Sequence, residues 1–454
     1  MEHLKQRIGK TVLYKANNFS KKLNSKQVYF KMEGLNPTGR VQDRIAYYLV
    51  KEATQLGFKT LTVASLGPLG ISLAYICNEF GIKCKIVIPE NSIDKKNKRF
   101  QEPGVEIIEY GKNYYIAYSK SKQLAKENNW YDANHGYYNL SITTSVYSEI
   151  SEEIVTKLGR NPDNVILFLS NGALTIGIHN GFRHLWRKGL IDRIPSIYVA
   201  CSDPDNMLLE AFNKKEHEIK NASEVKTRSL ITKRELNYKI VDPQQVLNAL
   251  YDSGGGIYYA SSENVKNTAR KLKESENINI SLRDTYTIQT LENLIHNKII
   301  KSDHENVVIL EEGKNELSIK TLGDDDFESF EQLAQYVEKY LGLYGDKRDD
   351  VLEAIRVSYK TGFILGAYIA GRMKGIAVVM GMPTKSVLPG YHLIYIGSDI
   401  TAGSRGIGTR LMEKIREKTE GNFSLHVDIE NKKAIKLYEK MGLKKSYYRM
   451  IYNK

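Results

Sequence analysis

Apolar runs rich in β-branched residues alternate with helix-like patterns along the first two thirds of the chain, from about residue 28 onward. Strands that are joined by helices pair in parallel, and the helices cover the faces of the resulting sheet. The alternation therefore predicts an α/β architecture with a largely parallel sheet. We expect strands at residues 59–64, 83–88, 105–109, 165–169, 197–200 and 307–310, and helices at 41–56, 114–128 and 143–158.

A different pattern begins near residue 316. A strand at 317–322 is followed by helices at 326–341 and 349–359, and then by two strands within 363–380 that turn at Gly371. Helices grouped beside antiparallel strands are typical of an α+β domain. At 454 residues the chain also exceeds what one hydrophobic core usually organises. We therefore expect two domains, residues 1–315 and 316–454.

The formal net charge is +13, but Lys and Arg are interleaved with Asp and Glu along nearly every expected helix. This distribution is typical of solvated surfaces and differs from the basic stripe of a nucleic-acid-binding protein. The three cysteines, Cys77, Cys84 and Cys201, lack the spacing of a zinc site and indicate reduced thiols without a bound metal. The first residues lack the apolar run of a signal peptide, and no apolar stretch is long enough to cross a bilayer. We expect a cytoplasmic protein that binds neither nucleic acid nor membrane.

Two segments near the C-terminus have fixed spacing. The first is Gly403-Ser404-Arg405-Gly406-Ile407-Gly408, between an expected strand at 391–397 and an expected helix at 409–418. A loop of this kind points backbone N–H groups at a helix N-terminus, where they bind a pyrophosphate. The second segment is an expected strand at 424–429 and a helix that begins at Asn431 and closes at Gly442. That helix carries Ala434, Leu437 and Tyr438.

In this order the two segments resemble the acyl-coenzyme A site of the GNAT acetyltransferase family. The resemblance implies acetyl-CoA as cosubstrate and direct attack of an amine on the thioester, in a groove between strands that part near Ile396. The implied CoA-binding residues are Ile396, Gly403, Ser404, Arg405, Gly406, Ile407, Gly408, Thr409 and Asn431. Two positions depart from the family pattern, because Gly403 stands where Gln or Arg is usual and Leu443 replaces a Phe. We expect the first change to weaken phosphate binding, with Arg405 supplying the charge instead.

Acetyl transfer needs one group that takes a proton from the amine and another that gives a proton to the departing thiolate. Tyr438 matches the position where this family commonly keeps the proton donor; its alternative role is to pack the last helix. Glu430 and Asp399 are the expected bases, since both are near the parting of the strands in sequence. His392 and a water-relayed proton are alternatives.

A second set of motifs lies in the first domain. Residues 31–44 read Lys-Met-Glu-Gly-Leu-Asn-Pro-Thr-Gly-Arg-Val-Gln-Asp-Arg, and further characteristic stretches follow at 131–134 and 177–182. Over about residues 10–314 the chain resembles the fold-type II pyridoxal-phosphate (PLP) enzymes of the threonine synthase and cysteine synthase group. The resemblance implies a tryptophan synthase β-like αβα domain with a PLP cleft that includes Asn36.

The residues that such a cleft needs are altered. These enzymes hold PLP as an imine to a lysine amine, but Gln42 stands at that position and its amide forms no imine. Pro68 replaces the Asn that contacts the ring hydroxyl, and Glu312 stands where a Thr-Gly or Ser-Gly pair usually meets the pyridine nitrogen. The phosphate cradle reads Ser170, Asn171 and Gly172, followed by Ala173 and Leu174 in place of two hydroxyl residues.

We interpret the first domain as a degenerate PLP-enzyme fold that does not bind PLP, with a smaller and more apolar cleft. The alternative is a different alignment of the loops, in which another lysine such as Lys31 carries the cofactor.

The leading functional prediction is an acetyl-CoA-dependent N-acetyltransferase that acts on a small amine, an amino acid or a derivative of one. The first domain would serve as scaffold or binding module and would form a homodimer. One alternative is a regulatory or partner subunit of an active PLP enzyme. A second alternative is a bifunctional PLP-dependent amino acid synthase and acetyltransferase.

Overall fold

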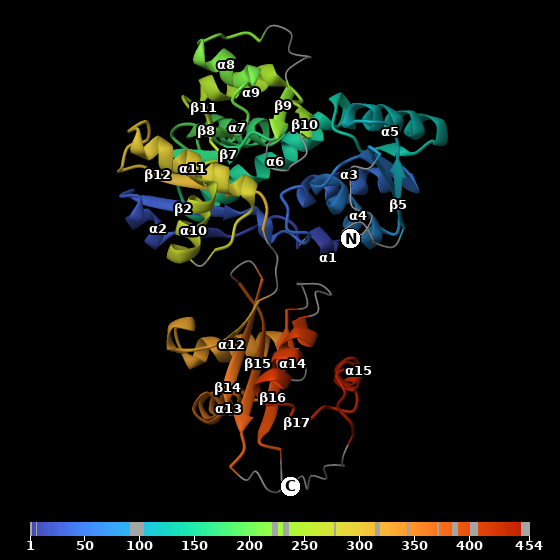
Figure 1. Cartoon of the computed structure of the whole chain (residues 1–454), viewed down its shortest axis with the longest axis vertical. Helices are drawn as coiled ribbons and strands as arrows, with labels where there is room; N and C mark the ends of the chain where they lie inside the picture. The colour runs from blue at the N-terminus through green and yellow to red at the C-terminus, as the bar shows by residue number, and fades with distance from the viewer. Residues whose placement is uncertain are drawn as a thin grey trace. The chain divides into compact units, whose positions relative to one another are not determined.

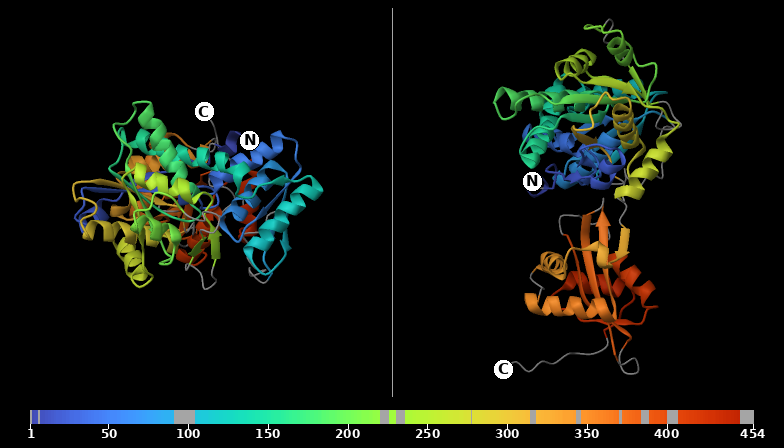
Figure 2. Two further views of the ribbon diagram at one scale, coloured as in Figure 1. Left: turned by 90° about the horizontal axis from the view of Figure 1, so that it is seen from above. Right: turned by 90° about the vertical axis from the view of Figure 1, so that its left-hand side faces the viewer.

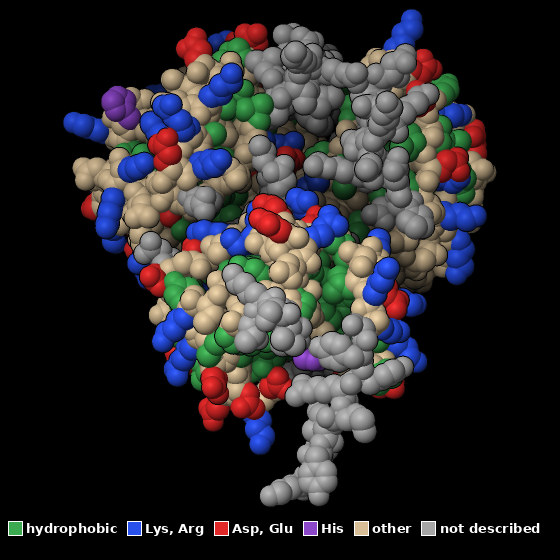
Figure 3. Space-filling model, turned by 60° about the horizontal axis from the view of Figure 1, so that its bottom comes forward, with side chains coloured by type: hydrophobic (Ala, Val, Ile, Leu, Met, Phe, Trp, Pro, Cys, Tyr) green, Lys and Arg blue, Asp and Glu red, His purple; other side chains and the backbone are tan. Residues whose placement is uncertain are grey.

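The computed structural model describes residues 2–5, 7–90, 104–219, 226–229, 236–276, 278–313, 318–342, 346–369, 372–383, 389–399 and 407–445. The chain divides into two compact units, Met1–Asn315 and Glu316–Lys454, which we describe separately (Figure 1). Among the described residues, we find no helix with both the length and the apolar character that crossing a membrane requires. On the face drawn in Figure 3, basic and acidic side chains are intermixed over the described surface.

The main sheet of the first unit has six strands in the order β1-β2-β12-β7-β8-β11. They are β1 (Leu13–Lys15), β2 (Gln27–Met32), β12 (Glu305–Leu310), β7 (Asn164–Phe168), β8 (Ser196–Cys201) and β11 (Gly256–Tyr259). β1 pairs with β2 in antiparallel fashion, and the other neighbouring strands are parallel. Every residue of β7 and β12 is buried, as expected for central strands with helices on both faces.

Helices cover both faces of this sheet because successive side chains of a strand point in opposite directions. Val165 and Val307 pack in a cluster with α6 (Tyr137–Leu158), α7 (Ala173–Arg187) and α9 (Pro243–Asp252). Ile166 and Val308 pack in a second cluster with α2 (Asn17–Lys22), α10 (Val265–Glu276) and α11 (Leu282–His296). The predicted α/β architecture is therefore confirmed.

A smaller parallel sheet of the same unit has the order β5-β4-β3-β6. Its strands are β3 (Thr60–Ala64), β4 (Lys83–Ile88), β5 (Val105–Glu109) and β6 (Tyr131–Asp132). The helices α3 (Asp43–Gln55) and α4 (Pro68–Phe80) pack against each other, and α5 (Tyr114–Asn128) contacts β3 and β4. In Figure 2 (left), α5 lies at the outer edge of the unit. The unit also contains α1 (Glu2–Lys5), η1 (Glu33–Leu35), α8 (Met207–Asn213) and an antiparallel ribbon of β9 (Lys226–Ser229) and β10 (Leu236–Lys239).

The second unit is built on a five-stranded sheet in sequence order. Its strands are β13 (Ser318–Thr321), β14 (Phe363–Ile369), β15 (Arg372–Gly381), β16 (Tyr391–Ser398) and β17 (Phe423–Leu425). Neighbours are antiparallel up to β16, and β17 is parallel to β16. α12 (Phe330–Leu341) and α13 (Arg348–Thr361) cover one face, whereas α14 (Ile407–Lys418) and α15 (Lys432–Lys440) contribute to the cluster on the other face.

Most expected elements are present, and three differ. α6 begins at Tyr137, earlier than the expected residue 143. The helix expected from residue 326 begins at Phe330, because a short turn, η4 (Asp324–Asp326), comes first and the Ser329 side chain caps α12 by accepting from the Gln332 N–H. The strand expected at 424–429 is limited to Phe423–Leu425. The expected turn at Gly371 lies outside the described residues.

Candidate functional sites

The first candidate site lies at one edge of the main sheet of the first unit. β2, β12 and β7 are neighbouring parallel strands, so their last residues Met32, Leu310 and Phe168 lie along the same edge. Ligands of α/β proteins bind at such carboxyl edges of strands. Backbone hydrogen bonds join the segments that follow β2 and β12, from the Val41 N–H to the Glu311 carbonyl (3.0 Å) and from the Gly313 N–H to the Gly39 carbonyl (3.0 Å). The edge therefore brings together the segments in which the sequence places a PLP cleft.

Gln42 lies directly before α3 at this edge. Its Oε1 atom is buried and accepts no hydrogen bond from the part of the chain that the structure describes. Asn36 is fully buried and is used internally, since its Oδ1 accepts from the Gly9 N–H (2.9 Å) and its Nδ2 donates to the Glu33 carboxylate (3.0 Å). Asn36 therefore stabilises the loop after β2.

The loop after β3 is closed by its own hydroxyl group. Ser65 Oγ accepts from the backbone N–H groups of Gly67 (3.3 Å) and Gly70 (2.9 Å). Pro68 is the first residue of α4, where its lack of an N–H is tolerated. The loop thus offers no side-chain amide at the position where the family resemblance places one.

The segment Ser170-Asn171-Gly172 leads from β7 into α7. Asn171 Oδ1 accepts from the Ala173 N–H (3.2 Å), so the segment satisfies one of the first N–H groups of α7 itself. Gly172 has φ +84°, and a Cβ there would come within 2.7 Å of Val246 Cγ2, so both conformation and space require glycine. Thr175 Oγ1 is buried without a partner among the described residues.

A buried group of carboxylates closes this edge. Arg283 Nη1 lies 3.3 Å from Glu311 and 3.6 Å from Glu312, and its guanidinium lies over the Phe168 ring. Asp284 accepts hydrogen bonds from the N–H groups of Glu311 (2.7 Å) and Glu312 (3.2 Å). Burial raises the pKa of Glu311 to about 7, against the opposing effect of Arg283. Burial and the two neighbouring glutamates raise the pKa of Asp284 as well.

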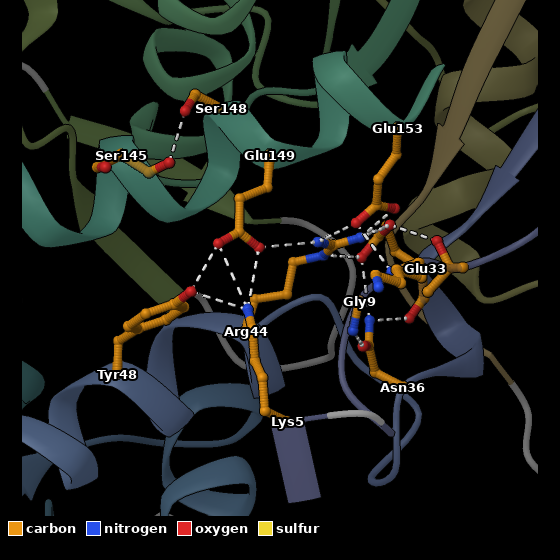
Figure 4. A network of polar contacts seen from close by, with 12 residues as sticks. Lys5, Gly9, Glu33, Asn36, Arg44, Tyr48, Ser145, Ser148, Glu149 and Glu153 are labelled. Atoms are coloured by element: carbon orange, nitrogen blue, oxygen red, sulfur yellow. Dashed lines mark hydrogen bonds and ion pairs between the residues drawn. The ribbon is translucent and has the colours of Figure 1, made fainter. Parts of the chain in front are cut away.

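Lys31 is part of a different network, which is largely buried. Figure 4 shows the surroundings of Arg44 in this network, with Glu33, Glu149 and Glu153. Lys31 Nζ lies 3.1 Å from Glu33 Oε1 and 2.6 Å from Glu153 Oε2, and it donates to the Thr11 carbonyl. Arg44 pairs with the same two carboxylates at 2.7 and 2.8 Å. Burial would raise the pKa of Glu33, but Arg44 and Lys31 hold it well below its ordinary value. Two cations and two carboxylates therefore neutralise one another inside the unit.

The second candidate site is a gap between two strands of the second unit. β16 pairs with β17 only from Tyr391 to Leu393, and Leu393↔Leu425 is the last pair. On its other side β16 has a bulge, because Val379 pairs with Leu393 whereas Val378 pairs with Tyr395, which leaves Ile394 between them. A bulge bends the strand that contains it, and this one lies directly after the last pair of β16 with β17. β17 ends at Leu425, before the end of the strand expected at 424–429. From Ile394 to Ser398, β16 has no strand partner on that side among the described residues.

The predicted CoA-binding residues are distributed around this gap. Ile396 projects into the cluster that contains α14 and α15, and α14 begins at Ile407 and includes Gly408 and Thr409. Asn431 is the N-cap of α15, where its side chain accepts from the Ala434 N–H (3.1 Å). The predictions for Gly403, Ser404, Arg405 and Gly406 lie outside the described residues.

The predicted catalytic residues lie in different surroundings. Tyr438 is nearly buried in the cluster on the α14 face, and burial raises its pKa to about 12. Asp399 follows β16 and forms an ion pair with Lys374 (2.8 Å) on the wall of a cavity of about 360 Å³ that α12 also lines. Glu430 is exposed in the turn before α15.

Sequence reasoning missed one residue beside the gap. The rings of His426 and His392 lie 4.6 Å apart, and His392 Nδ1 lies 2.9 Å from Ser424 Oγ. The signal was present in the sequence, because Ser424 and His426 are two residues apart and therefore share one face of an extended chain.

Each unit of the chain matches a known protein family. Residues 4–313 match the family described as pyridoxal-phosphate dependent enzyme, and residues 330–443 match the acetyltransferase (GNAT) family. A threonine synthase of Methanocaldococcus jannaschii is 30% identical over 306 residues, which are 66% of this chain and 73% of that protein. A cysteine synthase of Helicobacter pylori is 29% identical over 224 residues, 47% of this chain and 69% of that protein.

Solved structures share the fold of the first unit. A threonine deaminase isoform from Solanum lycopersicum aligns with a TM-score of 0.57 and 14% identity, over 68% of this chain and 86% of that chain. A serine racemase from Dictyostelium discoideum aligns with a TM-score of 0.54 and 17% identity, over 70% of this chain and 96% of that chain.

Proposed function

Because the chain belongs to the pyridoxal-phosphate dependent enzyme family and carries a GNAT acetyltransferase domain, we propose that its second unit transfers an acetyl group from acetyl-CoA to a small amine. The observation that carries the proposal is the gap between β16 and β17. The β16 edge from Ile394 to Ser398 offers backbone N–H and C=O groups to the amide groups of a pantetheine arm, in the manner of an added strand.

The surroundings of the gap suit such an arm. Ile396, Leu437 and Tyr438 provide apolar surface on the α14 face. Val427 and Ile429, which follow β17, are 38% and 74% exposed, and a bound pantetheine chain would cover them. Helix α14 begins shortly after β16, and its N-terminal N–H groups suit the pyrophosphate.

Tyr438 is the proposed proton donor to the departing thiolate. A tyrosine whose pKa is raised to about 12 by burial stays protonated at neutral pH and can give its proton when a thiolate forms beside it. The amine reacts as a free base, so a second group must accept its proton.

For the first unit we propose that the fold no longer binds PLP. The donor set at the sheet edge does not fit the cofactor, since Gln42 supplies an amide where an amine is required and the segment before α7 satisfies its own Ala173 N–H. Lys31, the alternative amine, is held between Glu33 and Glu153. The charged group of Arg283, Glu311 and Glu312 lies at the strand end where the resemblance places a hydroxyl residue. The unit would act as scaffold, dimerisation surface or amino-acid-binding module.

One experiment tests the transferase. Purified protein is mixed with acetyl-CoA and a panel of amines and amino acids, and the released thiol is measured. We expect thiol release that depends on one class of amine, and stabilisation of the second unit by CoA in thermal unfolding. If no amine accelerates thiol release and CoA stabilises nothing, the proposal is wrong.

The state of the first unit is tested separately. The protein is incubated with excess PLP, its visible spectrum is recorded, and the sample is reduced with borohydride before mass spectrometry. We expect neither the absorbance of an imine nor a pyridoxyl adduct in residues 1–315. An adduct on any lysine of that unit would overturn the proposal.

A further inference from the structure

We propose that His426 is the base that takes the proton from the attacking amine, and that His392 is the positioning residue that orients its ring. This inference rests on the proposed acetyltransferase function and assigns a residue to a step which that function leaves open. It starts from the contact between the two imidazole rings, whose centroids are 4.6 Å apart at an interplanar angle of 59°.

The pair lies at the apex of the gap. His392 pairs in register with Ser424, one position before the last pair Leu393↔Leu425, and His426 is the first residue after β17. His392 Nδ1 lies 2.9 Å from Ser424 Oγ, which fixes the orientation of the His392 ring. The exposed ring of His426 contacts this fixed ring at the point where the two strands part.

The two histidines lie on the face of the sheet opposite to Tyr438. Tyr391, Leu393, Phe423 and Leu425 all belong to the cluster that contains α14 and Tyr438. Side chains alternate along a strand, so His392 and Ser424 point to the other face, which α12 and α13 cover. His426 contacts His392 and therefore lies on that face too.

This arrangement separates the two proton transfers. The amine nitrogen forms a bond to the thioester carbon and the carbon–sulfur bond breaks. An ammonium group that becomes an amide loses two protons in the process. One proton reaches solvent through His426. The other replaces the proton that Tyr438 donates to the thiolate, so that the tyrosine ends the reaction protonated. The products are the N-acetyl amide and the free CoA thiol. Because His426 and Tyr438 lie on opposite faces of the sheet, the amine enters from the face of His426 and CoA leaves from the face of Tyr438.

The two carboxylates predicted as bases are less well placed. Asp399 is paired with Lys374 and stands six residues beyond Leu393, which corresponds to about 20 Å of extended strand. Glu430 is exposed and follows His426 by four residues. The groups paired with His392 in the sheet are Ser424 of β17 and Met380 of β15, and neither carries a charge. The chain then continues from His426 to the exposed carboxylates of Asp428 and Glu430.

The test compares His426→Gln and His426→Asn with the unaltered protein, using the best amine of the panel. We expect kcat/KM for the amine to fall by about 100-fold, the size usual for a lost general base. CoA should stabilise the variants as much as the unaltered protein, since CoA is proposed to bind along β16 and the α14 face. Imidazole added to the buffer should restore part of the rate.

The pH profile separates a base from a structural residue. An imidazole must be neutral to accept a proton, so the rate of the unaltered protein should fall as pH drops below neutrality. The fall in rate at low pH should be absent in His426→Gln. In His392→Gln the fall should remain but occur at a different pH, and the overall loss of rate should be smaller than in His426→Gln. His184→Gln, an exposed histidine of the first unit, is the control and should change nothing.

The outcomes are distinguishable. If the unaltered protein acetylates an amine and His426→Gln keeps both the rate and the acidic fall, this inference is wrong and the proposed function stands. If Glu430→Gln or Asp399→Asn abolishes the acidic fall instead, the base is that carboxylate. If the unaltered protein acetylates no amine, the proposed function fails and this inference fails with it.

Discussion

Lys31 Nζ lies 2.6 Å from Glu153 Oε2, in a contact that joins β2 to α6 across the interior of the first unit. The lysine side chain is 1% exposed, and Glu33 is its second partner. This contact gives Lys31 a structural role.

Lys31→Met should strongly destabilise the first unit, because it removes one of the two cations that neutralise the buried Glu33 and the partly buried Glu153 and leaves Arg44 as the other. Breaking a buried ion pair from one side typically costs about 3–5 kcal/mol. Scanning calorimetry of the full chain would measure the loss as a lower unfolding temperature of the large unit. Lys5→Met removes the more exposed contact with Glu149 and is the matched control, with an expected change of about 0–1 kcal/mol. Equal effects of the two substitutions would contradict the assignment.

Glu311 should make the first unit less stable as pH rises. Its pKa is raised to about 7 in the folded protein, so between about pH 4.3 and 7 the folded state holds a proton that the unfolded state has lost. Stability from this group is therefore present at acidic pH and is lost as pH rises through about 7. In Glu311→Gln the unfolding temperature should change less between about pH 5 and 8. The substitution should remove a pH-dependent loss of folding free energy that reaches about 3 kcal/mol at the upper end of this range. Glu127→Gln, which removes an exposed carboxylate of the same unit, is the control. An unchanged slope in Glu311→Gln would refute the prediction.

Tyr438→Phe should lower kcat by about 100-fold while acetyl-CoA binding is preserved, because only the hydroxyl group is removed from an apolar environment. Steady-state kinetics and calorimetric titration with acetyl-CoA would separate these effects. Tyr391→Phe, in the same cluster but on β16, should retain activity. A Tyr438→Phe protein with an unaltered kcat would leave the tyrosine with a packing role.

Asn431→Ala should weaken α15 by removing its N-cap, with a cost of about 1 kcal/mol. Thermal unfolding of the second unit would detect the loss. Asn431→Ser keeps a capping oxygen and should recover most of the stability. If Asn431→Ser also loses CoA affinity although the cap is kept, Asn431 contacts CoA in addition to capping the helix.

The fold of the first unit could be predicted from local sequence because its strands and helices alternate with strong patterns. The strands expected at 83–88 and 105–109 have those bounds in the structure. The partners of buried charges could not be predicted in this way. Glu153 neutralises Lys31 from 122 positions away, and tertiary packing, in which α6 lies against α3 and α7, brings the two together.

In the second unit the two C-terminal motifs predicted the order of the elements, and the family resemblance predicted that two neighbouring strands, β16 and β17, separate. The strands part at the residue where β16 has its bulge, and that bulge is a property of the pairing of β16 with β15, which the local sequence does not encode. His426 was missed because the local pattern extended β17 through it, whereas the strand ends at Leu425.

The short β17 has a practical consequence for handling the protein. Beyond Leu393, the β16 edge that faces β17 has no strand partner among the described residues and has exposed apolar neighbours, and such an edge is a template for pairing with another chain. Coenzyme A seated along β16 would mask that template, so concentrated stocks kept with the nucleotide should show less turbidity over time than stocks kept without it.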